Sequence, residues 1–161
     1  MSETMLKKHQ CIPFIATAVT GSGAEKTYTW KRVDKSTIFS LNPNPQTETM
    51  DWISTELPEE VIDHYEPELP QEIATYEGNP VYDFMFGKFF DLPVGSDANV
   101  PCLICFPGSD KKAWLIDACT VQLGEFNTVD KKISFTLKFG GDIARGTYAI
   151  ANGVPTFTAG T

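Results

Sequence analysis

Several absences in the sequence narrow the class of protein. The 161 residues contain no apolar run long enough to span a membrane, and Met1–Gln10 lacks the apolar centre of a signal peptide. We therefore expect the chain to stay in the cytosol in which it is made, with no membrane partner. Without a secretory signal, the four cysteines are expected to be free thiols. The hydrophobic content of 42% is typical of a globular chain, and the length suits one domain over residues 1–161.

Patterns that bind metals or cofactors are also missing. The Walker pattern GxxxxGK[ST] and the DxDxDG spacing of a calcium loop do not occur. Cys102 and Cys105 have the CxxC spacing of zinc and redox sites, but they fall in a predicted strand, where their odd separation places the side chains on opposite faces. The remaining cysteines and histidines are not paired at a ligand spacing. The sequence therefore predicts buried structural thiols, no metal and no cofactor.

No arrangement of catalytic residues is recognisable. The nucleophile motif GxSxG does not occur. His64 stands between Asp63 and Glu66 and could be considered a general base, but without a nucleophile the better interpretation is a residue of an extended loop. Asp117 lies in a predicted strand and is as easily a surface residue as a catalyst. The sequence therefore predicts that the protein is not an enzyme.

Positive charge is missing from the middle of the chain. The net charge is −8, and no Lys or Arg occurs between Lys35 and Lys88. The acidic residues of this interval are Glu48, Asp51, Glu56, Glu59, Glu60, Asp63, Glu66, Glu68, Glu72, Glu77 and Asp83. An acidic middle with more basic flanks could pair head to tail between copies of the chain, or it could be a solvated acidic loop. The negative balance argues against nucleic-acid binding by phosphate neutralisation.

One stretch has clear helical signals. Asn79 is a good N-cap, Pro80 fits the first helical position, and Asp83 in the first turn suits the helix dipole. Pro93 ends the helix, which is predicted over residues 80–92. The apolar stripe at i, i+3, i+4 spacing consists of Tyr82, Met85, Phe86, Phe89 and Phe90. We expect this stripe to pack on a sheet as core.

The rest of the chain has the features of β-structure. Strands are predicted over 11–20, 27–33, 36–41, 100–106, 113–123, 131–139, 147–151 and 154–158. The strands 27–33 and 36–41 are expected to form a hairpin, Gly140–Asp142 is expected to be a turn, and Asn152-Gly153 predicts a type I′ hairpin. Many short strands with one helix predict a mainly β fold: a β-sandwich or small barrel with one flanking α-helix and a long extended loop.

The long loop is an acidic arm over residues 42–71. It contains five prolines, yet it also carries apolar residues that a flexible linker would not need. Within it, Thr49–Ser54 and Glu68–Thr75 could pair as strands. Its apolar residues must be buried on the parent domain or on a partner, and they form the predicted subunit interface. These interface residues are Trp52, Ile53, Leu57, Val61, Ile62, Tyr65 and Leu69.

A spaced set of short matches covers most of the chain from about Thr27 onward. The matching runs are Phe39–Glu48, Tyr76–Phe84, Leu92–Ala98, Ile133–Ile143 and Gly153–Thr158. In these runs the sequence resembles the major tail tube proteins of long-tailed bacteriophages, in the form found in prophages of Gram-positive bacteria. That resemblance implies a β-sandwich with one flanking helix, similar to the tube protein of type VI secretion systems.

The resemblance also implies a function in the virion tail. Six subunits would form a ring, and stacked rings would form a tube, assembled in the bacterial cytoplasm, through which DNA passes without specific binding. The implied partners are further copies of the chain, the tape measure protein, the tail terminator and the distal tail or baseplate proteins. The long loop would reach a neighbouring subunit or ring. An acidic lumen would repel the phosphates of passing DNA.

Two other classes of function remain open from the sequence. One is a β-sandwich that binds carbohydrate, in which Trp30, Trp52 or Trp114 would line a shallow site, although core packing is the commoner role of a tryptophan. The other is a small enzyme that uses His64 or the cysteines.

Overall fold

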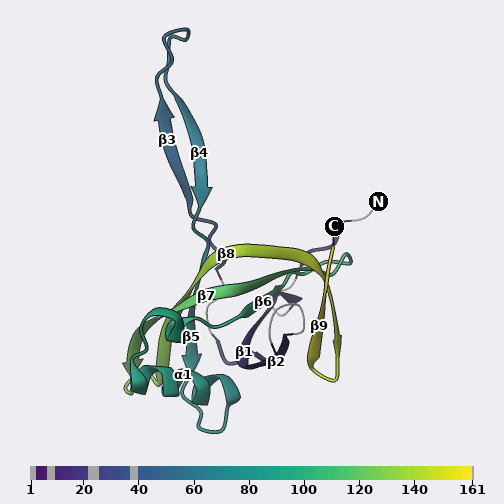
Figure 1. Ribbon diagram of the computed structural model, residues 1–161. Coiled ribbons are helices and arrows are strands. Elements are labelled where there is room, and N and C mark those ends of the chain that lie inside the picture. Colours follow the sequence, from purple (N-terminus) through teal and green to yellow (C-terminus); the bar gives the residue numbers. More distant parts are fainter. Residues whose placement is uncertain (1–2, 7–9, 22–25, 37–39, 161) are drawn as a thin grey trace.

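The computed structural model describes residues 3–6, 10–21, 26–36 and 40–160. In these residues nine strands and one α-helix occur (Figure 1). The elements are β1 (Ile12–Thr20), β2 (Thr27–Arg32), β3 (Pro45–Met50), β4 (Glu59–Tyr65), β5 (Glu68–Ala74), α1 (Pro80–Asp91), a 3-10 helix η3 (Gly95–Ala98), β6 (Cys102–Cys105), β7 (Lys112–Asn127), β8 (Lys132–Ala151) and β9 (Val154–Ala159). The prediction of a mainly β fold with one helix is confirmed.

Seven strands form one antiparallel sheet. Their order is β2-β1-β6-β7-β8-β5, and β9 also pairs with β8. The 20-residue β8 is long enough to pair with β7 on one edge and with both β5 and β9 on the other. The strands of the described residues do not close into a barrel. The second sheet contains only β3 and β4.

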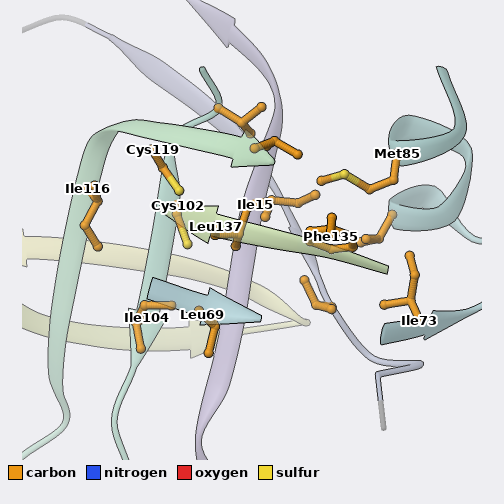
Figure 2. Close-up of a cluster of buried hydrophobic side chains, with 14 of the residues drawn as sticks. Ile15, Leu69, Ile73, Met85, Cys102, Ile104, Ile116, Cys119, Phe135 and Leu137 are labelled. Atoms are coloured by element: carbon orange, nitrogen blue, oxygen red, sulfur yellow. The ribbon is translucent and has the colours of Figure 1, made fainter. Parts of the chain in front are cut away.

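Both faces of the main sheet are buried at strand β6. Cys102 and Ile104 belong to the larger core cluster, whereas Leu103 and Cys105 belong to the smaller one. This alternation confirms that the two cysteines of the CxxC pair point to opposite faces. Figure 2 shows Cys102 beside Cys119 in the larger cluster, with Met85 reaching in from α1.

Helix α1 begins at Pro80 as predicted and ends at Asp91, one residue before the predicted end. The Asn79 side chain accepts hydrogen bonds from the backbone N–H groups of Val81 (3.1 Å) and Tyr82 (3.2 Å), and Leu92 caps the helix in the left-handed conformation. The predicted stripe is only partly core, however. The buried helix residues are Val81 and Met85.

The outer part of that stripe faces solvent. Phe86 is 41% exposed and Phe90 is 78% exposed. The physical reason is the width of the apolar surface: Tyr82 and Phe89 are partly buried against the larger core cluster, and the body does not extend far enough to cover Phe86 and Phe90. Phe86 instead contacts Phe126 and Phe90 at the rim, with ring centroids 5.7 and 6.4 Å apart.

The predicted hairpin of strands 27–33 and 36–41 is wrong in its pairing. β2 pairs with β1, from Thr20 opposite Thr27 to Phe14 opposite Arg32. Residues 37–39 lie outside the described residues, but Ser36 bridges Ile73 of β5. Alternation in β2 fixes which side chains share a face, and it does not specify which strand is the partner.

The predicted turn at Gly140–Asp142 is also wrong, because β8 runs through it. Gly141 has a φ of 69°, and the β7–β8 register shifts across from it, between Ile116 and Ala118. Across this shift β8 has one more residue than β7, so the left-handed Gly141 lies in a bulge of β8 that bends the long hairpin without ending it. By contrast, the type I′ turn is confirmed: Asn152 and Gly153 both have positive φ, and Ala151 pairs with Val154.

Candidate assembly interface

The arm is a hairpin that projects from the body of the molecule (Figure 1). β3 pairs with β4 from Pro45 opposite Tyr65 to Met50 opposite Glu59, and residues 51–58 form the tip. This pairing replaces the predicted pairing of 49–54 with 68–75. Of the predicted arm, residues 45–65 form the projecting hairpin, whereas the segment from Glu68 onward is β5 of the main sheet.

The base of the arm is held by backbone hydrogen bonds. Asn42 and Glu68 exchange two of them, at 3.0 and 2.9 Å, and the Glu66 N–H donates to the Asn44 carbonyl at 3.1 Å. Asn44 takes a positive φ of 46°, which asparagine tolerates, and its N–H is held by the Asn42 side chain at 2.9 Å. The arm therefore leaves the body at a defined point.

Six of the seven predicted interface residues are exposed on this hairpin. At the tip, Ile53 is fully exposed, Leu57 is 75% exposed and Trp52 is 49% exposed. The other three are Val61, Ile62 and Tyr65, which are 42–54% exposed. Every residue of β4 is exposed. These six residues are available to a partner.

The seventh residue, Leu69, is placed in the core. It is completely buried in β5, opposite Leu137 of β8. The sequence offered no means of separating it from the arm, because its burial depends on pairing with a strand that comes about seventy residues later.

The arm has no core of its own. Val61 and Ile62 are consecutive in β4 and therefore point to opposite faces of a two-stranded sheet, which no third strand and no helix of the described chain covers. Isolated two-stranded hairpins are marginally stable in water. Burial of these apolar groups on another molecule would stabilise the hairpin.

The arm also carries His64, the residue considered above as a general base. The exposed His64 ring lies 2.7 Å from Asp63 Oδ2 and 3.2 Å from Glu66 Oε1, and hydrogen bonds to these two carboxylates raise the pKa of His64. In the described residues no group of three or more His, Cys, Asp or Glu side chains is arranged to hold a metal ion. Among the described residues, no nucleophilic side chain contacts His64.

The cysteines are structural neighbours of apolar groups. Burial raises the pKa of Cys105 to about 12 and that of the half-buried Cys11 to about 11. Contact with Cys119 and burial also raise the pKa of Cys102. All four thiols are free. Thiols held in the protonated state are weak nucleophiles, as expected for packing residues.

Asp117 of β7 lies opposite the Gly141 bulge of β8 and connects two parts of the sheet. Its carboxylate accepts hydrogen bonds from Lys26 Nζ at 2.8 Å and from the Tyr28 hydroxyl at 2.9 Å. The lysine holds the pKa of Asp117 below its usual range, while burial and the carboxylate raise the pKa of Tyr28 to about 12. This contact joins the β1–β2 hairpin to β7 and is structural.

A second surface was missed from the sequence. A groove of about 820 Å³ opens where the Phe106–Lys112 turn meets β8. Trp114 lies opposite Arg145 across the β7–β8 ladder and packs edge to face against Phe106, with 5.0 Å between ring centroids. Lys112 also lines the groove. Only the β7–β8 register brings Trp114 and Arg145 together, so no local pattern could have indicated the groove.

The three tryptophans of the carbohydrate hypothesis do not share a surface. Trp114 lines the groove, Trp52 lies at the arm tip, and Trp30 packs against the smaller core cluster beside Tyr28. No helix among the described residues is long and apolar enough to cross a membrane.

Comparison with known proteins gives a likeness of fold. No family model and no curated protein matches the sequence. A chain in the cryo-EM structure of an extracellular contractile injection system, the PVC sheath/tube terminator in the extended state, is similar over 91% of this chain and 100% of its own, with 7% identity and a TM-score of 0.55. A chain in the cryo-EM structure of the anti-feeding prophage (AFP) baseplate, 6-fold symmetrised, is similar over 91% of this chain and 98% of its own, with 9% identity and a TM-score of 0.50. The fold of this chain is therefore one that also occurs in these phage-tail-like assemblies.

Proposed function

We propose that the protein is a structural subunit of a phage-type tail that assembles into hexameric rings stacked as a tube for the passage of DNA. The observation that carries the proposal is the arm: a hairpin with exposed apolar residues and no core, firmly anchored to a well-packed sheet. A monomer would have no use for such a structure, whereas a polymer subunit needs a segment that reaches its neighbour.

The fold supports the same class of function. Both similar chains come from assemblies whose names describe injection systems or their baseplates. On this proposal the partners are further copies of the chain, the tape measure protein, the tail terminator and the distal tail or baseplate proteins. The site of action is the virion tail.

The charge of the chain fits a conduit. The net charge of −8 opposes adhesion of DNA phosphates, so that DNA would pass the subunits without being held. The proposed interface residues are the six exposed apolar residues of the arm, and Leu69 acts only in the core.

A second candidate function is the tube terminator. It is favoured by the similarity to a chain in the sheath/tube terminator structure. A terminator forms one ring and stops, whereas a tube protein stacks without limit. Negative-stain microscopy of the purified protein, with and without a tail initiator complex, distinguishes single rings from long tubes.

The arm proposal is tested by removing the hairpin at its base. Asn44 and Glu66 are already hydrogen-bonded, so residues 45–65 can be replaced by Asn-Gly, which favours a two-residue hairpin turn. We expect this variant to fold with an unchanged thermal midpoint of the body and to form no rings or tubes. A second variant keeps the arm but changes Trp52, Ile53 and Leu57 to serine. We expect that it also fails to assemble.

Normal tubes from the arm-deleted variant would contradict the role of the arm. Specific glycan binding by a protein that stays monomeric even with an initiator would favour the carbohydrate module instead. That alternative has less support, because its three tryptophans lie on separate parts of the molecule.

A further inference from the structure

We propose that the arm tip of one copy docks in the basic groove of a second copy, the groove formed by Phe106, Lys112, Trp114 and Arg145. This inference rests on the proposed self-assembly and adds the acceptor surface, which the fold likeness does not specify.

The groove presents aromatic surface with positive charge at its rim. It continues the face of the sheet that carries the larger core cluster: Ile116 opposite Ile143 is followed by Trp114 opposite Arg145 and then by Lys112 opposite Thr147. Along this row the buried Ile116 and half-buried Ile143 are followed by the half-buried Trp114 with the exposed Arg145, and then by the exposed Lys112. The apolar part of the groove is open to a partner.

No carboxylate of the described residues neutralises the cations of the groove. Elsewhere Lys26, Lys132 and Lys138 form salt bridges with carboxylates. Among the described residues, neither Lys112 nor Arg145 forms an ion pair. Of the described residues that line the groove, Asp110 is the one that is acidic. Exposed and unpaired cations beside an indole can accept an acidic, apolar segment at a small desolvation cost.

The arm tip has the complementary chemistry. Its exposed apolar residues Trp52, Ile53 and Leu57 are flanked by Asp51 and Glu56, which are also exposed. The whole hairpin, residues 45–65, carries six acidic residues and no Lys or Arg. Apolar residues next to carboxylates in the tip match an aromatic groove lined by two cations.

The arm does not fill the groove of its own chain. Figure 1 shows the tip projecting away from the sheet, well separated from the turn between β6 and β7 that borders the groove. Ile53 is fully exposed at that tip. An arm tip that docks in this groove must therefore belong to another copy.

The acceptor is identified by photo-cross-linking in the full-length chain. Ile53 is replaced by p-benzoylphenylalanine, the protein is assembled and irradiated, and cross-linked peptides are mapped by mass spectrometry. We expect links between position 53 and residues 106–114 or 145–147 of another copy. Cross-links from an assembled sample that map to the exposed Phe86–Phe90 side of α1 would overturn the docking site and leave self-assembly intact. A chain that neither assembles nor cross-links at any concentration, with initiator present, would overturn self-assembly as well.

Charge reversal gives an independent test. Arg145→Glu should raise the concentration needed for assembly at least tenfold, whereas Lys131→Glu, at an exposed position in the β7–β8 turn, should change it less than twofold. Reversing the tip as well, with Asp51→Lys and Glu56→Lys added to Lys112→Glu and Arg145→Glu, should restore assembly. If this quadruple variant folds with a wild-type circular dichroism spectrum and still fails to assemble, the proposed pairing is wrong.

Discussion

Two of the antiparallel hairpins, β7–β8 in the body and β3–β4 in the arm, have very different surroundings. β7–β8 is joined by β6 on one edge and by β5 and β9 on the other, and its inward side chains are buried. β3–β4 has no further strand and no covering layer among the described residues. Both segments carry apolar residues, so hydrophobicity alone does not decide burial. What decides it is whether other elements of the same chain cover the hairpin.

The strongest test of this comparison is a pair of leucine truncations. Leu69→Ala removes a fully buried side chain from β5 and should lower the free energy of unfolding by about 2–5 kcal/mol. Leu57→Ala, at the arm tip, should change it by no more than about 0.5 kcal/mol. Guanidinium unfolding of the two variants, followed by tryptophan fluorescence, measures the difference. Equal losses would mean that the arm packs on its own body.

Neighbouring residues of α1 sharpen the comparison within the body. Met85 is fully buried, and Met85→Ala should cost about 2–5 kcal/mol of stability. Phe86 is 41% exposed and touches mainly other rim aromatics, so Phe86→Ala should cost about 1 kcal/mol. Urea unfolding of both variants at pH 7 provides the values. A larger loss for Phe86 would show that the rim aromatics are part of the core.

A smaller effect is expected from the ion pair between Lys26 and Asp117 in the body. The pKa of Asp117 is lowered by Lys26, so this carboxylate stabilises the fold above its unfolded-state pKa of about 3.9, and the contribution is lost as the pH falls through the lower folded value. Because both side chains are substantially exposed, Asp117→Asn should cost only about 0.5 kcal/mol at pH 7. The urea midpoints of wild type and variant should converge as the pH is lowered below about 4. A difference that persists there would assign the effect to something other than charge.

The smallest effect is expected from the ion pairs of the arm. The pKa of His64 is raised by Asp63 and Glu66, and Asp63→Asn should lower it, as measured by NMR titration of the ring protons. A raised pKa would stabilise the fold below the unfolded-state value of about 6.5 and lose that contribution at higher pH. These partners lie within two residues of His64, so the unfolded chain can form the same contacts. His64→Gln should therefore leave the unfolding midpoint unchanged between pH 5 and 8, and a shift would show that the arm contributes to stability.

The parts of the fold that depend on neighbours in sequence could be predicted. The Asn79 cap and the Asn152-Gly153 turn are set by local backbone preferences, and both occur where the sequence places them. The opposite orientation of Cys102 and Cys105 follows from the period of a strand and is also confirmed.

The parts that depend on which strands pair could not be predicted. The pairing of β5 with β8, far apart in the sequence, and that of β2 with β1, its neighbour in the sequence, were both missed, because alternation determines a face and not a partner. For the same reason the sequence could not distinguish Leu69 from the six arm residues. It also could not indicate the groove, where Trp114 meets Arg145 through the β7–β8 register. The apolar acidic character of the arm was visible in the sequence, whereas the surface proposed to receive it was not.

The way in which the arm joins the body determines how the subunit bears load. β4 continues through Pro67 into β5, which lies roughly in line with it (Figure 1). A pull on the tip therefore acts along β5 and loads its seven residue pairs with β8 in shear, all at once, instead of opening them one after another. The arm is thus anchored through a whole strand, and on the proposed function this anchorage would suit a connection between subunits of a tube that is bent or emptied.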